Sequence, residues 1–227
     1  MLETMTSNSF FAMALTLAAY LIGVFCQKKG KKAIFNPILI GAVLVMLALW
    51  ALGIPVEQYH QDCKALSYWM TPATICLAIA FYEQLQSLKQ HLGAILVGVV
   101  GGTLSSLLTV GLLCRAFGLS EVLTVSLLPK SVTAAIGVAL SEQAGGVGAL
   151  TTTVISLTGI LGNVAGPMLA KWFHLEDPVS QGVAFGTASH VIGTSRATEI
   201  SQLAGAVSSL SLTLAGLLTV LVLSIAL

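Results

Sequence analysis

The sequence predicts an all-α polytopic membrane protein in which some helices are broken. Only 8% of the 227 residues are charged and the mean hydropathy is +0.94. These values exclude an ordinary soluble domain and a disordered chain. About 20 apolar residues cross a bilayer core, and the charges separate eight segments of roughly that kind: Ser7–Gln27, Ala33–Gly53, Ala65–Tyr82, Leu92–Cys114, Leu119–Glu142, Val147–Phe173, Val179–Arg196 and Ala204–Leu227.

Two of these segments are predicted to be discontinuous at corresponding places of a chain that forms one domain, 1–227, with halves 1–117 and 118–227. In the third segment Pro72 removes a backbone donor and disfavours helix at Thr71. In the seventh, Gly186–Thr194 is rich in small residues. The two halves have the same membrane orientation if each contributes four spans, and opposite orientations if an extra hairpin enters the membrane and returns to the same side. Broken segments at matching positions indicate a transporter site at a repeat interface.

Lysine and arginine predict the orientation of the chain. If every segment crosses the membrane, the basic run Lys28–Lys32, Lys89 and Arg196 lie on one side. The positive-inside rule then places the Lys28–Lys32 loop in the cytoplasm and both termini outside. The prediction depends on full crossing by segments three, five and seven.

Lys130 is the most informative single residue. Between Glu121 and Glu142 it is the only charge, in an apolar stretch, and a lysine at the bilayer centre costs about 2.5–3.5 kcal/mol on insertion scales. Such residues usually face a cavity or a partner. The alternative is that Lys130 reaches the interface or pairs with an acid such as Glu142 or Glu199.

The residues around Lys130 favour an anion site. Pro129 interrupts a helix here, and Ser131 and Thr133 follow as small hydroxyl residues. The N–H groups of a new helix start carry partial positive charge, which adds to that of the ammonium group.

The stretch Gly186–Arg196 is the second candidate. Its density of glycine, serine and threonine suits a backbone that approaches a ligand closely. His190 either couples proton movement to transport or is simply a hydrogen-bonded helix residue. Arg196 either clamps a carboxylate or anchors at the interface. The candidate binding residues here are Thr187, Ser189, His190, Thr194 and Arg196, and a third helix start adds Thr71 and Thr74.

Other functional classes are poorly supported. The chain lacks the GxSxG, HExxH and GxxxxGK[ST] motifs, and a helix would point Ser189 and His190 about 100° apart, so no catalytic dyad is expected. The four cysteines have no metal-binding spacing. A net charge of +1 argues against nucleic acid. We therefore expect no enzyme activity, no cofactor and no metal.

Several motifs resemble those of the LrgB/CidB family of membrane proteins, over nearly the whole chain. The pairing of Leu127-Leu-Pro-Lys-Ser-Val-Thr133 with Gly186-Thr-Ala-Ser-His190 is the most specific. The others are Asn36-Pro37-Ile-Leu, Thr71-Pro-Ala-Thr74, Tyr82-Glu-Gln84, Gly159-Ile-Leu-Gly162 and Gly205-Ala-Val-Ser-Ser-Leu210.

The resemblance implies an inner-membrane protein of a family described as antiholin-like and linked to murein hydrolase export and autolysis. Plastid relatives are glycolate/glycerate translocators, and bacterial relatives are associated with pyruvate uptake beside a small LrgA-type partner. Two departures stand out. The family commonly has Thr-Pro at Ala134-Ala135 and Pro-Leu-Tyr at Ala80-Phe81-Tyr82, so segments three and five are expected to be more regularly helical here.

The leading hypothesis is a secondary transporter for a small monocarboxylate that is pyruvate- or glycolate-like. Lys130 and helix N-termini would bind the anion, and His190 would move a proton. A homodimer is expected because so small a transporter gains a scaffold by pairing. The alternative is a holin-like pore or regulator that modulates cell-wall hydrolases without a saturable substrate.

Overall fold

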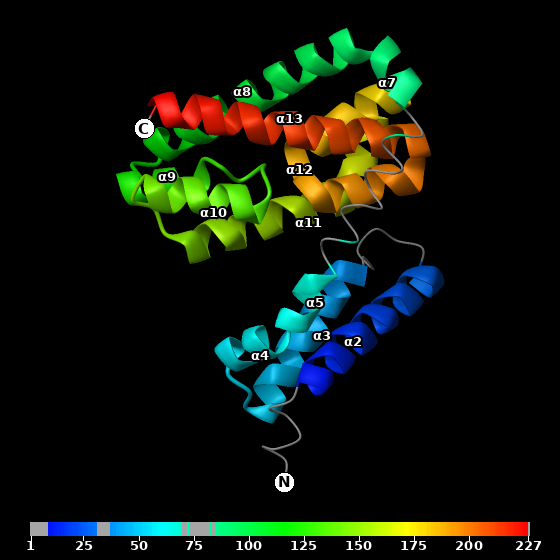
Figure 1. Ribbon diagram of the computed structural model, residues 1–227, viewed down its shortest axis with the longest axis vertical. Helices are drawn as coiled ribbons and strands as arrows, with labels where there is room; N and C mark the ends of the chain where they lie inside the picture. Colours follow the sequence, from blue (N-terminus) through cyan, green and yellow to red (C-terminus); the bar gives the residue numbers. More distant parts are fainter. Residues whose placement is uncertain (1–8, 31–36, 70–71, 73–81, 83–84, 227) are drawn as a thin grey trace. The chain divides into compact units, whose positions relative to one another are not determined.

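The computed structural model describes residues 9–30, 37–69, 72, 82 and 85–226 (Figure 1). Within these ranges the chain is helical and has no strand, so the predicted all-α membrane fold is confirmed. The chain forms two compact units, Met1–Ala78 and Ile79–Leu227. The proposed sequence halves, divided after residue 117, concern internal repeats and stay a prediction.

The first unit is built on a pair of apolar helices, α2 (Ser9–Gly30) and α3 (Pro37–Leu52). They pack closely at Gly23, where a Cβ would lie 2.6 Å from the carbonyl oxygen of Pro37. The chain then bends by 118° into α4 (Val56–Asp62), which is followed by α5 (Lys64–Tyr68).

The second unit contains the remaining helices and both candidate motifs that the structure describes. Its elements are α7 (Leu85–Gln90), α8 (Leu92–Ala116), α9 (Glu121–Leu127), α10 (Ala134–Gln143), α11 (Gly148–Trp172), α12 (Pro178–Ile200) and α13 (Gln202–Ala226). An apolar core joins α8, α12 and α13, with Ile95, Val99, Val179 and Val207 fully or almost fully buried.

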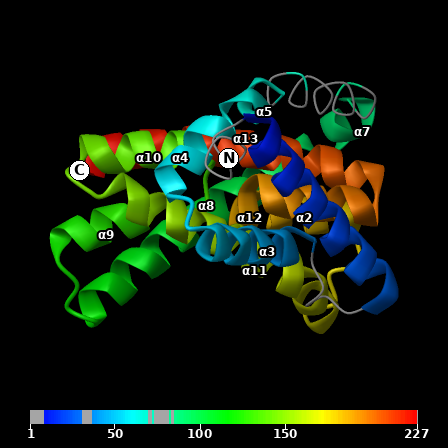
Figure 2. The ribbon, with the colours of Figure 1, turned by 90° about the horizontal axis from the view of Figure 1, so that it is seen from below.

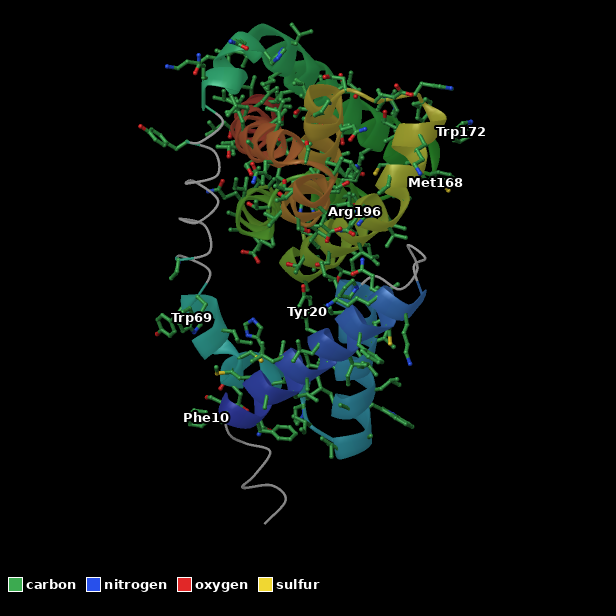
Figure 3. All side chains as sticks on the ribbon, turned by 90° about the vertical axis from the view of Figure 1, so that its right-hand side faces the viewer. Phe10, Tyr20, Trp69, Met168, Trp172 and Arg196 are labelled. Carbon is green, nitrogen blue, oxygen red and sulfur yellow. The ribbon has the colours of Figure 1, made fainter. Side chains whose placement is uncertain are left out.

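Four described helices are long and apolar enough to cross a membrane: α2, α8, α11 and α13. The bent pair α3 and α4 brings the number to five if it counts as one span. These correspond to predicted segments one, two, four, six and eight, and most of segment three lies outside the described residues. Large apolar side chains such as Met168 and Trp172 point outward from α11 (Figure 3), as expected for a lipid-facing surface.

Close glycine contacts fix the relative directions of α8, α11 and α13. A Cβ at Gly98 of α8 would contact Val183 of α12, and a Cβ at Gly102, one turn later in α8, would contact Thr187, one turn later in α12. Gly182 and Gly186 of α12 in turn face Ala204 and Ser208 of α13. The first part of α12 is therefore parallel to both α8 and α13.

The direction of α11 is opposite. Gly166 faces Phe185, whereas Gly162, one turn earlier in α11, faces Ser189, one turn later in α12. Because α11 is antiparallel to α8 and α13, the connection between α8 and α11 starts and ends on one side of the unit. The connection between α11 and α13 starts and ends on the other side. Neither connection therefore adds a membrane crossing to those of α8, α11 and α13.

The second connection, α12, is a helical hairpin. His190 has φ 43° and ψ −138°, which is outside the helical region. The chain reverses at His190, so that both arms, residues 178–189 and 191–200, pack against α13. Gly186 of the first arm and Thr194 of the second both contact Ser208, although eight residues of straight helix span about 12 Å.

The first connection contains α9, the loop 128–133 and α10. Ser126 near the end of α9 accepts a hydrogen bond from the backbone N–H of Val147, which follows α10, at 2.8 Å. The chain thus leaves α9, turns through the loop and returns along α10. Figure 1 shows α9 and α10 at the end where α8 and α13 finish. Figure 2 shows α10 beside the last turns of α13, where Leu140 and Leu223 pack together.

One expectation from the sequence is wrong. Segment five is not regularly helical despite Ala134-Ala135, because Thr133 has extended backbone (ψ 150°) and α10 begins anew at Ala134. The predicted orientation depends on full crossing by segments five and seven. In the structure both segments return to the end of the second unit at which they start, and the orientation stays a prediction.

Candidate functional site

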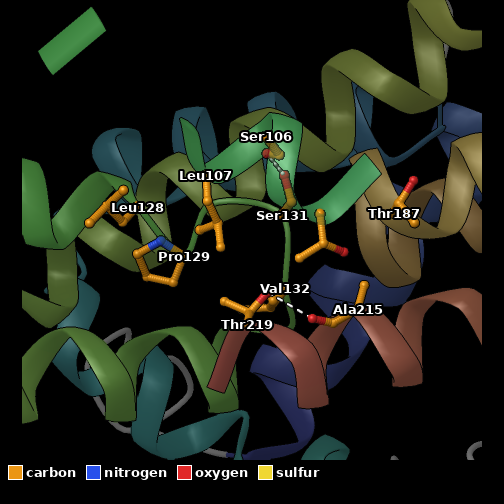
Figure 4. Close-up of a pocket in the computed structure, with 10 residues that line it drawn as sticks. Ser106, Leu107, Leu128, Pro129, Ser131, Val132, Thr187, Ala215 and Thr219 are labelled. Carbon is orange, nitrogen blue, oxygen red and sulfur yellow. Dashed lines mark hydrogen bonds between the residues drawn. The ribbon is translucent and has the colours of Figure 1, made fainter. Parts of the chain in front are cut away.

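A small cavity lies where the two returning connections meet, near the middle of α8 and α13 (Figure 4). Its volume is about 10 Å³, which is room for about one water molecule. The polar lining comes from four elements: Thr103 and Ser106 of α8, Ser131 of the loop, Thr187 of α12 and Thr219 of α13. The two motifs that the sequence singled out, around Lys130 and around His190, therefore both contribute to the lining of this cavity.

Lys130 is bound to the rim of this cavity by hydroxyl groups. Its Nζ donates to Ser131 Oγ at 3.0 Å and to Ser106 Oγ at 3.3 Å. The Ser106 and Ser131 hydroxyls are themselves 3.1 Å apart (Figure 4). Within the part of the chain that the structure describes, Lys130 has no ion pair with an acid, and Glu199 pairs with Arg196 instead. The positive charge is thus available to an anion.

His190 is the tip of the α12 hairpin and is 4% exposed. Its Nε2 donates a hydrogen bond to the carbonyl oxygen of Ile155 at 2.8 Å, because a carbonyl can only accept. Asn163 of α11 donates to the carbonyl oxygen of Ile192 at 2.8 Å, just after the tip. These two bonds hold the tip on α11.

The tips of the two connections are close to each other. Gly137 of α10 packs against Ile155, whose carbonyl binds His190. The carbonyl oxygen of Pro129, the residue before Lys130, lies 3.3 Å from the same Cβ position at Gly137. The Lys130 loop and the His190 tip therefore approach the same part of α11.

Each connection also places a helix start near its tip. α10 begins at Ala134 beside the loop, and its N-cap residue Thr133 makes no side-chain capping bond. The second arm of α12 begins directly after His190. Free N–H groups at helix starts carry partial positive charge, which favours an anion in this region.

Three other predicted residues have structural roles in the second arm and tip of α12. Ser189 is buried against Gly162. Thr194 donates to the carbonyl oxygen of His190 at 2.9 Å and lies 2.8 Å from Ser208 Oγ, which fastens the hairpin to α13. Arg196 is bonded to Glu199 on the partly exposed surface of the arm, an arrangement that favours the anchoring role over a clamp. Thr71 and Thr74 lie outside the described residues.

Sequence reasoning missed Thr103, Ser106 and Thr219. Thr103 is 4% exposed and its Oγ1 has no hydrogen-bond partner among the described residues. The available signal was the polar group Thr103-Leu-Ser-Ser106 inside the otherwise apolar segment Leu92–Cys114. Burial depends on the neighbours of a helix, so this signal alone did not separate a cavity wall from a lipid-facing surface.

The arrangement is suited to anion binding by an ammonium group and hydroxyl groups in an apolar surrounding. Among the described residues no group of histidine, cysteine, aspartate and glutamate could hold a metal ion. The positive charge of Lys130 also disfavours a cation in the cavity.

Comparison with known proteins identifies relatives for almost the whole chain. The model of the LrgB-like family matches residues 16–227. The chain is 32% identical over 218 residues to proteins named antiholin-like protein LrgB from Bacillus cereus (strain B4264) and Bacillus anthracis (strain CDC 684 / NRRL 3495). The matches cover 96% of this chain and 95% of each relative. No solved structure is significantly similar.

Proposed function

Because the chain belongs to the LrgB-like family of membrane proteins, we propose that it is a secondary transporter whose substrate is a small monocarboxylate of the pyruvate or glycolate type. One observation carries the proposal. Two connections that enter the second unit from opposite sides meet at a polar cavity. Beside this cavity lies the ammonium group of Lys130, which has no acidic partner among the described residues. Transporters bind substrates at mid-membrane sites of this kind.

The roles follow from the contacts. Lys130 binds the carboxylate, and Ser131 and Ser106 hold the ammonium group in place and line the site. The helix start at Ala134 adds partial positive charge, with Thr133 beside it. Thr187 contributes to the opposite wall.

His190 is proposed to carry a proton with the substrate. It lies at the hairpin tip and bonds to Ile155, which also packs against Gly137 of the connection that holds Lys130. A bound carboxylate offsets the Lys130 charge, and this reduces the repulsion that a protonated His190 would feel. Anion and proton then bind more favourably together than apart, which is the requirement for symport.

The cavity is too small for a complete monocarboxylate, since it holds about one water. Substrate entry therefore requires one of the connections to move. The loop 128–133 and the His190 tip are the proposed moving parts, because the loop lines the cavity and the tip follows Thr187, which also lines it. Opening them in turn from opposite sides gives alternating access.

The orientation is proposed from the second unit. Lys89 precedes α8, while Lys171 and Arg196 lie at the end of α11 and in the second arm of α12, so all three are on the side where α8 begins. Arg115 is on the other side. The positive-inside rule places the first side in the cytoplasm and the C-terminus outside. An inner-membrane location, a homodimer and an LrgA-type partner complete the proposal.

A second candidate function is supported by the printed names of the relatives. These are antiholin-like proteins, and the names favour a regulator of cell-wall hydrolases over a transporter. Such a regulator does not require a saturable substrate. It also gives no reason for a lysine that has no acidic partner among the described residues and lies beside a buried cavity.

Uptake of labelled pyruvate, glycolate and lactate into proteoliposomes, with and without a pH gradient, separates the two functions. We expect saturable uptake that an inward proton gradient stimulates. Absence of saturable uptake of every small carboxylate, in protein shown to be folded and inserted, would remove the transporter hypothesis and leave the regulator.

A further inference from the structure

The free hydrogen-bond acceptors of the cavity lie on one wall, and the free hydrogen-bond donors lie on another. Thr187 donates its hydroxyl proton to the carbonyl oxygen of Val183 at 2.7 Å, and Thr219 donates to Ala215 at 2.7 Å (Figure 4). Carbonyl oxygens only accept, so both threonine hydroxyls have already used their donor. Toward the cavity they offer lone pairs alone.

The wall near Lys130 has the opposite character. Ser106 and Ser131 share one hydroxyl proton between them, which leaves the other serine proton free. Lys130 uses two of its three N–H groups on these serines. This wall therefore presents donors and a positive charge, and suits a carboxylate.

Thr103 is the remaining polar residue of the cavity lining. It lies one turn before Ser106 on α8, about 4.5 Å along the helix axis, and lines the cavity. The residue is 4% exposed, and its buried hydroxyl has neither a donor nor an acceptor among the described residues. A buried hydroxyl in this state is unfavourable unless something binds it.

We propose that Thr103 is a specificity-determining residue that binds a hydroxyl group of the substrate, so that a 2-hydroxycarboxylate is preferred to the corresponding 2-oxocarboxylate. The inference rests on the proposed transport function. A hydroxyl both donates and accepts, so it satisfies Thr103 and also donates to the lone pairs of Thr187 or Thr219. A 2-oxo group only accepts, and it leaves those acceptors unpaired in a buried site.

Gly102 supports this assignment. A Cβ at this position would lie 3.1 Å from Thr187 Oγ1, so the absence of a side chain lets Thr187 approach α8 beside Thr103. The cavity volume of about 10 Å³ matches a group of the size of one hydroxyl or water. The carboxylate would lie toward Lys130, where the donors are.

L-lactate and pyruvate form the matched test pair, since they differ only in the 2-hydroxyl and the 2-oxo group. In proteoliposomes we expect the wild-type protein to have a higher kcat/KM for L-lactate. Thr103→Val, which keeps the shape of the side chain, should lower kcat/KM for L-lactate about tenfold or more, while pyruvate changes less than about threefold. Thr103→Ser should restore the preference.

The outcomes separate this inference from the proposed function. Saturable pyruvate uptake that equals or exceeds L-lactate uptake, unaffected by Thr103→Val, overturns the role of Thr103 and leaves the transporter. Equal losses for both acids, without rescue by Thr103→Ser, would mean that Thr103 is only structural and would also overturn the inference. No saturable uptake of either acid overturns the transporter and this inference together.

Discussion

The ammonium group of Lys130 donates a hydrogen bond to the hydroxyl of Ser106 at 3.3 Å, and this bond joins the loop 128–133 to the middle of α8. A hydroxyl group stabilises a charge in an apolar surrounding less than a carboxylate does. The pair therefore leaves Lys130 in need of a counter-ion, which is the condition that a transporter can satisfy with its substrate.

Replacing Lys130 by methionine should abolish most anion uptake without loss of folding. A charge-assisted hydrogen bond contributes about 1.5–3 kcal/mol, so kcat/KM should fall about 10- to 150-fold. The melting temperature in detergent should be unchanged or higher, because a costly charge is removed. Lys89→Met, on the exposed surface of α7, is the matched control and should transport normally. A Lys130→Met protein that fails to insert would instead identify a structural role.

Replacing His190 by glutamine should make uptake insensitive to the proton gradient while substrate binding persists. The amide of glutamine can still donate to the carbonyl oxygen of Ile155, so the tip stays on α11. Glutamine does not titrate, and the coupling to pH is therefore lost. The measurement is uptake against external pH at fixed substrate. An unchanged pH response would show that another group carries the proton.

The sequence predicted that the helices of the site are broken, but it did not predict the path of the chain at the breaks. Pro129 and the run of small residues Gly186–Thr194 indicated breaks, and both breaks exist. A straight helix and a hairpin with arms 178–189 and 191–200 have the same local pattern, however, so the reversal at His190 was not predictable. The role of Thr103 depends on the contacts of α8 with two other helices, and a residue list does not contain that information.

Replacing Gly162 by alanine should destabilise the α12 hairpin. The new methyl group would overlap the Ser189 hydroxyl, and such overpacking costs about 1–3 kcal/mol. Gly101→Ala on α8 is the control, because no atom of the described residues lies within 4 Å of its Cβ position. It should be neutral or stabilising by about 0.5–1 kcal/mol. Thermal unfolding in detergent compares the two, and an equal effect would contradict the close packing of α11 on α12.

Asp177 caps the first turn of α12 outside the membrane-spanning part. The backbone N–H of Ser180 donates to Asp177 Oδ2 at 2.8 Å and holds the pKa of this carboxyl below its ordinary value. A lowered pKa means that the carboxylate stabilises the fold at neutral pH, and that this contribution is lost as the pH falls below about 4.

Asp177→Ala should therefore lower stability by about 1 kcal/mol at pH 7, and the difference from wild type should shrink in acid. Asp177→Asn keeps a capping oxygen without a titrating charge and serves as the control. Unfolding temperatures measured between pH 7 and pH 3 test both variants. A difference for Asp177→Ala that stays constant over this range would rule out the carboxylate contribution.

The returning connections make a specific prediction about sidedness. If α9–α10 and α12 do not cross the membrane, Lys89 and Lys171 lie on the same side and Arg115 lies on the opposite side. Full crossing by segment five would place Lys89 and Lys171 on opposite sides, because three crossings would then separate them.

Single cysteines at the three positions, in a background without the native cysteines, distinguish these arrangements by labelling with a membrane-impermeant thiol reagent. We expect Lys89→Cys and Lys171→Cys to react from the same side, and Arg115→Cys from the other. Reaction of the two lysine positions from opposite sides would disprove the re-entrant path of α9–α10.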